Sequence, residues 1–159
     1  MVVERIVSGG QTGADRGGLD AAIDLGIAHG GWCPAGRLAE DGKIPERYRL
    51  TETESADFAV RTELNVIDSD GTVLFTYGEP VGGSALTAEL ASVHDKPLLH
   101  LDLEVHAIGS AAAQLAVWLE QHHVRVLNVA GSRESQAPGI ADAVREVLLT
   151  ALSGQRQDS

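Results

Sequence analysis

Apolar residues along the chain fall into five short continuous runs and five longer segments with helical spacing. The runs occupy residues 5–7, 27–31, 72–76, 97–103 and 124–129. Short, continuously apolar runs are typical of strands that are buried on both faces. Apolar residues recur at helical spacing over residues 12–25, 55–67, 85–93, 107–122 and 138–152, which predicts five helices. The second half of the segment 55–67 also favours an extended conformation, and this alternative stays open.

Strands that alternate with helices predict a parallel sheet. We therefore expect an α/β fold, a three-layer sandwich with a mainly parallel sheet of about five strands. Residues 1–152 form a single ligand-binding domain in this prediction, and the polar residues 153–159 form a flexible tail. Residues 35–50 are rich in charges and lack a clear period, so we expect a long loop there.

Two glycines, Gly17 and Gly18, fall inside the first predicted helix. Each costs about 1 kcal/mol relative to alanine in a helix interior. Either this helix packs closely on the sheet or on another subunit, or it begins later than the apolar spacing indicates.

Three of the predicted strands are followed by polar, glycine-rich segments, at residues 8–16, 78–84 and 130–135. The carboxyl ends of parallel strands meet at one edge of a sheet, where open α/β sheets bind ligands. Glycine lets the main chain approach a ligand closely, and helix amino termini favour anions. The alternative for each segment is an ordinary glycine-rich turn. We predict a phosphate-binding site at this edge, formed by Gly9, Gly10, Gln11, Thr12, Gly13, Asp15, Arg16, Gly82, Gly83, Ser84, Thr87, Arg133 and Ser135.

The residue types suggest which groups of such a site would hold the phosphate. The main-chain N–H groups of the first segment would hold the phosphate, and Arg16 would pair with it or with Asp20 one helical turn away. Further cations that could reach the site are Arg37, Lys43 and Arg61.

Asp70 is a further candidate, because it ends an Asp-Ser-Asp sequence just before the most apolar run. Its carboxylate would orient the ligand or hold Mg²⁺ together with phosphate oxygens. The same residues are also typical of a turn.

Composition narrows the class of protein. The 159 residues carry a formal net charge of −11 with a hydrophobic fraction of 43%, which fits a globular domain and argues against general binding of nucleic acid. No apolar run has the roughly 18 residues that a membrane helix needs, and the first residues do not resemble a signal peptide. A single cysteine, Cys33, fits a reducing compartment. We expect a cytoplasmic protein that binds neither nucleic acid nor membrane.

Several blocks of the sequence resemble a known family, the putative molybdenum carrier proteins. The resemblance runs from about Arg5 to Ile140. Its blocks are SGGQTGADRGGLD (8–20), GWCPAGR (31–37), AEDG (39–42), RT (61–62), NV (65–66), DSD (68–70), GGSALT (82–87), KPL (96–98) and LNVAGSRES (127–135).

This resemblance implies a Rossmann-like fold related to the Lonely Guy and lysine-decarboxylase-like proteins, and a homodimer or homotetramer. It also implies binding of molybdenum cofactor, a phosphorylated pyranopterin, by a carrier rather than an enzyme. In such a protein Cys33 is either a thiolate ligand of molybdenum or a buried thiol.

The wider superfamily suggests an alternative function, a nucleotide-binding protein or a phosphoribohydrolase. Lonely Guy phosphoribohydrolases carry a motif of the type P-G-G-x-G-T-x-x-E, and residues 81–89 match its double glycine and, at Glu89, its glutamate. Val81 stands where the motif has proline, and Ala85-Leu86 stand where it has Gly-Thr. Glu89 is therefore either an acid/base or a solvated helix residue, and the departures favour the second.

Overall fold

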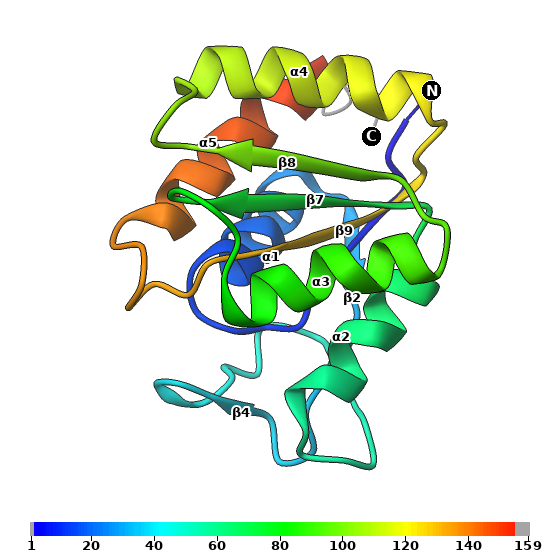
Figure 1. Cartoon of the computed structure of the whole chain (residues 1–159), viewed down its shortest axis with the longest axis vertical. Coiled ribbons are helices and arrows are strands. Elements are labelled where there is room, and N and C mark those ends of the chain that lie inside the picture. The colour runs from blue at the N-terminus through cyan, green and yellow to red at the C-terminus, as the bar shows by residue number, and fades with distance from the viewer. Residues whose placement is uncertain (1, 155–159) are drawn as a thin grey trace.

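A five-stranded parallel sheet forms the centre of the computed structural model, which describes residues 2–154 (Figure 1). The strand order is β2-β1-β9-β7-β8, and the register pairs Val7 with both Gly30 and Asn128. The predicted α/β, Rossmann-like class with five sheet strands is confirmed. These strands are β1 (Arg5–Val7), β2 (Ala28–Gly30), β7 (Gly71–Thr76), β8 (Leu98–Asp102) and β9 (Val126–Gly131).

Two layers of helices cover the sheet. On one face α5 (Ile140–Leu152) packs between α1 (Ala14–Leu25) and α4 (Ile108–Gln121), and on the other α2 (Phe58–Ile67) lies beside α3 (Gly82–Val93) (Figure 1). All five predicted helices are present. The alternative of an extended second half of residues 55–67 is wrong, because α2 continues to Ile67. Its start is set by Asp57, whose carboxylate accepts a hydrogen bond from the Ala59 N–H at 2.9 Å, a helix cap.

Close packing explains the two glycines inside α1. A Cβ added at Gly18 would lie 2.7 Å from Cβ of Val129 in β9, and one at Gly17 would collide with the main-chain oxygen of Ala141 in α5. Helix α1 begins at Ala14, so both glycines lie inside it. They allow the helix to approach both the sheet and the neighbouring helix.

The segment predicted as a long loop contains regular structure. Within it, strands β4 (Leu38–Ala39) and β5 (Gly42–Lys43) form an antiparallel hairpin. The two strands on either side of the segment, β3 (Trp32–Cys33) and β6 (Thr51–Glu52), pair in parallel. Beneath them lies a small apolar core of Leu19, Cys33, Ile44 and Tyr48. The sequence pattern did not reveal this core, because its two buried side chains in the segment, Ile44 and Tyr48, lie among many charged residues.

The end of the chain was predicted as a flexible tail over residues 153–159. Ser153 and Gly154 continue α5 as a short 3₁₀ turn, and residues 155–159 lie outside the described part of the chain. Within residues 2–154, no helix combines the length and the apolar character that crossing a bilayer requires.

Candidate ligand-binding site

The three glycine-rich segments meet at the carboxyl edge of the sheet. The first and third are joined by two hydrogen bonds, from the Ala14 N–H to the Ser132 carbonyl at 3.0 Å and from the Glu134 N–H to the Thr12 hydroxyl at 3.2 Å. The third is also joined to the end of β7, because the Ser132 N–H donates to the Phe75 carbonyl at 2.9 Å. These bonds fix the walls of a cavity.

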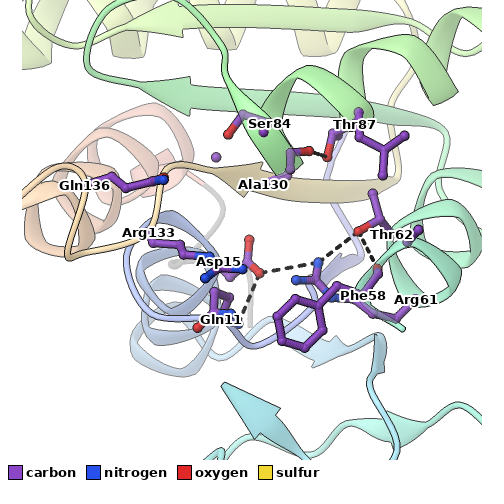
Figure 2. A pocket seen from close by; sticks show the side chains of 15 residues that line it. Gln11, Asp15, Phe58, Arg61, Thr62, Ser84, Thr87, Ala130, Arg133 and Gln136 are labelled. Atoms are coloured by element: carbon purple, nitrogen blue, oxygen red, sulfur yellow. Dashed lines mark hydrogen bonds and ion pairs between the residues drawn. The ribbon is translucent and has the colours of Figure 1, made fainter. Parts of the chain in front are cut away.

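This cavity, called the edge cavity below, has a volume of about 300 Å³. It lies between the start of α1, the start of α3, the first turns of α2 and the loop after β9 (Figure 2). Its lining residues are Gln11, Asp15, Phe58, Ala59, Arg61, Thr62, Gly82, Gly83, Ser84, Leu86, Thr87, Ala130, Gly131, Arg133 and Gln136.

Asp15 and Arg61 form a buried ion pair in the wall of the edge cavity. Their side chains are 5% and 13% exposed, and Asp15 Oδ2 lies 3.9 Å from Arg61 Nη1. The same oxygen accepts a hydrogen bond from the Gln11 N–H at 3.1 Å. Burial raises the pKa of the Asp15 carboxyl, and the attraction of Arg61 and the Gln11 hydrogen bond offset only part of that rise.

Arg61 reaches the cavity from α2 because Gly9 leaves room for it. The Arg61 guanidinium lies against the Gly9 main chain, where any added Cβ would collide with it. Arg61 donates to the Thr62 hydroxyl at 3.2 Å, and its Cζ lies 5.5 Å from the centre of the Phe58 ring. Cζ of Arg133 lies 5.4 Å from the same ring. Phe58 thus brings two cations to one side of the cavity.

Gln11 has a side-chain hydrogen-bond donor that no group in residues 2–154 accepts. Its Oε1 accepts the N–H groups of Thr12 at 3.1 Å and of Glu40 at 2.9 Å, which fixes the orientation of the amide. In the described residues, the buried side-chain polar atoms without a partner are Gln11 Nε2 and Arg61 Nε. Buried donors are paired in the great majority of cases, so an unpaired one indicates strain, function or a missing partner.

The start of α3 adds partial positive charge to that of Arg61 and Arg133. Its N-cap residue, Val81, makes no side-chain cap, and the first three helix residues line the cavity. A Cβ added at Gly82 or Gly83 would meet no atom within 4 Å, so this end of the helix is open. Uncapped N–H groups and the helix dipole favour an anion here.

The first glycine-rich segment contributes differently from what we expected. Its N–H groups at Gly10, Gln11 and Thr12 are taken by Ser8 Oγ, by the Asp15 carboxylate and by Gln11 Oε1. The expected open cradle of main-chain N–H groups is therefore wrong for these three residues. Gly13 has φ +82°, and a side chain there would collide with the Ser132 carbonyl, so this glycine allows the first and third segments to pack together.

Other predicted residues lie outside the edge cavity, in a separate open groove beneath the β4–β5 hairpin. Arg16 donates two hydrogen bonds, of 2.6 and 2.8 Å, to the Asp41 carboxylate of the hairpin. Arg16 was predicted to pair with the phosphate, with Asp20 as the alternative; it does not line the edge cavity, and the alternative is wrong. Ser135 and Thr12 donate to the Glu40 carboxylate. The hydrogen bonds from Ser135 and then Thr12 lower the pKa of Glu40. These contacts tie the hairpin to the loops.

Two carboxylates singled out from the sequence are remote from the edge cavity. Asp70 precedes β7 and so lies at the amino edge of the sheet, where its Oδ2 accepts the N–H groups of Arg125 at 3.0 Å and Val126 at 2.8 Å. Glu89 is an exposed residue of α3 and does not line the cavity.

Three further candidates do not line the edge cavity. Arg37 donates to the main-chain oxygens of residues 44, 45 and 48, and Lys43 is exposed on the hairpin. Cys33 is buried in the small core, where burial raises its thiol pKa. Within residues 2–154, no cluster of three or more His, Cys, Asp or Glu side chains could hold a metal ion.

Sequence reasoning missed part of the cavity wall. Phe58, Thr62, Ala130 and Gln136 line it and were not among the predicted site residues. Arg61 was considered only as one of several distant cations. One signal in the sequence could have identified Arg61 and Thr62. They form one of the blocks shared with the family, although they do not follow a predicted strand as the other site segments do.

A Rossmann-like domain with a polar cavity at the carboxyl edge of its sheet belongs to a large class of ligand-binding folds. Within that class, residues 6–152 match the circularly permutated YpsA SLOG family, and the chain belongs to this family.

A crystal structure of the putative molybdenum carrier protein from Syntrophus aciditrophicus SB is similar to this chain. The two share 48% sequence identity over 95% of this chain and 96% of that chain, with a TM-score of 0.93. This likeness confirms the resemblance found in the sequence. None of the curated proteins matches the chain.

Proposed function

We propose that this protein binds a phosphorylated small molecule in the edge cavity. The observation that carries the proposal is that Gln11 and Arg61, each of which has a buried donor atom without a partner in the described residues, both line this cavity. Arg133 and the open start of α3 add positive charge to the same cavity. Phosphate oxygens are strong acceptors that pair well with guanidinium groups and helix amino termini. A bound phosphate would therefore accept hydrogen bonds from groups that line the cavity.

Molybdenum cofactor is the candidate ligand, because the similar protein from Syntrophus aciditrophicus is named for carrying molybdenum. The residues fit the organic part of this cofactor. Gln11, Arg61 and the start of α3 would hold its phosphate, while Phe58 offers an aromatic surface for its pterin. Since the described residues contain no metal-binding cluster, the protein's hold would be on the phosphate and the pterin. The cofactor would then be cargo.

A nucleotide is the second candidate, because it too combines a phosphate with a planar ring. Hydrolysis that uses Glu89 finds no support, since this residue is exposed and outside the cavity. Among the described residues, Asp15 is the carboxyl group that lines the cavity. Since the arrangement points to no particular reaction, we propose binding as the function.

The proposal is tested by titrating molybdenum cofactor and AMP into the protein and into two arginine variants. Arg61→Ala should weaken binding roughly 10- to 100-fold, the effect of losing a charged hydrogen bond. Arg125→Ala is the matched control, because Arg125 is exposed and pairs with Glu4. It should bind as the unaltered protein does.

A cavity-filling variant gives a second, independent test. A side chain at Gly83 meets no atom within 4 Å of its Cβ, so Gly83→Leu should fold normally and abolish binding by occupying the site. Unchanged binding by both Arg61→Ala and Gly83→Leu would refute the proposed location. The expected homodimer or homotetramer remains a prediction, to be measured by sedimentation.

A further inference from the structure

We propose that Asp15 makes the edge cavity selective for an oxyanion that carries a proton, such as hydrogen phosphate, over one that carries none, such as sulfate. This inference rests on the proposed function, since it concerns the anionic group of the same ligand, whose phosphate ester would bind in its singly protonated form. It assigns Asp15 the role of a specificity-determining residue.

The geometry leaves one oxygen of Asp15 available to a ligand. Oδ2 accepts the Gln11 N–H at 3.1 Å and faces Arg61 at 3.9 Å. No hydrogen bond within the described residues reaches Oδ1, and Figure 2 shows this oxygen directed into the cavity, toward the side where Ser84 and Ala130 lie. Any anion held by Gln11 and Arg61 would lie beside a carboxylate.

The cations around Asp15 cannot supply this selectivity. Arg61 of α2, Arg133 of the loop after β9 and Arg16 of α1 are the charged groups that act on its carboxyl. Helix α3 and strand β9 bring only uncharged side chains to the cavity. These guanidinium groups attract any dianion, so they raise the affinity for phosphate and sulfate alike.

The proton decides between the two anions. An ionised carboxylate only accepts hydrogen bonds, so an oxyanion oxygen that faces it must carry hydrogen. Hydrogen phosphate and sulfate have nearly the same size, shape and charge, but only the first has a hydroxyl to donate. With sulfate, or with molybdate at neutral pH, two unprotonated oxygens would face each other in a buried place, which is unfavourable.

The experiment measures the binding of inorganic phosphate, sulfate and molybdate to the whole protein at pH 7.5. We expect phosphate to bind at least about 10-fold more tightly than sulfate, the effect of one charged hydrogen bond gained or left unmade. Asp15→Asn should remove the preference, mainly by strengthening the binding of sulfate, because an amide can donate to either anion. Asp142→Asn, an exposed carboxylate of α5, should keep the preference.

A pH series on the unaltered protein gives a second measurement that needs no variant. Burial raises the pKa of Asp15, so lowering the pH favours its protonated form, which can donate to sulfate. The preference for phosphate should therefore shrink as the pH falls. If phosphate and sulfate bind equally well at pH 7.5, and Arg61→Ala abolishes the binding of both, the role of Asp15 is overturned. The proposed site is then still supported. A preference that survives Asp15→Asn would also overturn the role of Asp15. If no phosphorylated compound binds, the proposed function and this inference both fail.

Discussion

Replacing Gly18 by alanine tests the close approach of α1 to the sheet. Helix propensity alone favours alanine by about 1 kcal/mol. The new Cβ would, however, lie 2.7 Å from both Cβ and Cγ1 of Val129, a fully buried residue in the middle of the sheet. Overpacking of a core costs typically about 1–3 kcal/mol, and Val129 cannot move without its strand. Two contacts of 2.7 Å with this side chain place the cost in the upper part of that range, about 2–3 kcal/mol. Less the gain in helix propensity, the free energy of unfolding should fall by about 1–2 kcal/mol.

Urea denaturation followed by circular dichroism measures this loss, and thermal unfolding should show a melting temperature about 2–8 °C lower. Gly109→Ala is the matched control, because Gly109 lies in α4 and an added Cβ there meets no atom within 4 Å. This control should be as stable as the unaltered protein or more stable, by up to about 1 kcal/mol. If Gly18→Ala is stabilised as much as the control, the close packing of α1 on β9 is not the reason for its glycine.

Three further substitutions test the cavity and its surroundings. Asp15→Asn should raise the free energy of unfolding near neutral pH, because burial raises the pKa of Asp15 in the folded protein. This gain should vanish as the pH falls below the ordinary pKa of an aspartate, where the folded and unfolded states are both protonated, and a pH-independent gain would contradict this. Gly9→Ala should displace the Arg61 guanidinium and weaken binding of the phosphorylated ligand roughly 10-fold while the protein stays folded, as calorimetry would show. Tyr48→Phe removes the hydrogen bond that the hydroxyl donates to Asp20 at 2.7 Å and should cost about 1 kcal/mol in urea denaturation; an unchanged stability would show that this bond contributes nothing.

The fold could be predicted almost completely because its signals are local. Strand β7 is buried at every position, and such a strand appears in the sequence as a continuous apolar run. The starts of α2 and α3 each differed from prediction by three residues, because helix ends depend on capping contacts. The β4–β5 hairpin was missed, since two short strands with charged neighbours give no clear period.

The candidate site could be predicted only in part. The sequence located the polar segments that follow strands, and Gln11, Asp15 and the start of α3, all predicted as ligand-binding, line the edge cavity. Arg16 and Arg61 show the limit of that reasoning. Both are arginines on helices, yet one is held by the hairpin at Asp41 and the other lines the cavity. Nothing in the local sequence distinguishes them.

The sequence by itself determined the layers, the order of elements and the edge of the sheet at which polar segments gather, because periodicity and strand ends are properties of neighbouring residues. Only the tertiary structure decided which side chains share the cavity and which of their atoms stay unpaired. Asp15 meets Arg61 from another helix, and the Gln11 amide is oriented by the Glu40 N–H of the hairpin. Such contacts join segments distant in the chain, and they depend on how closely glycines such as Gly9 and Gly18 allow those segments to approach.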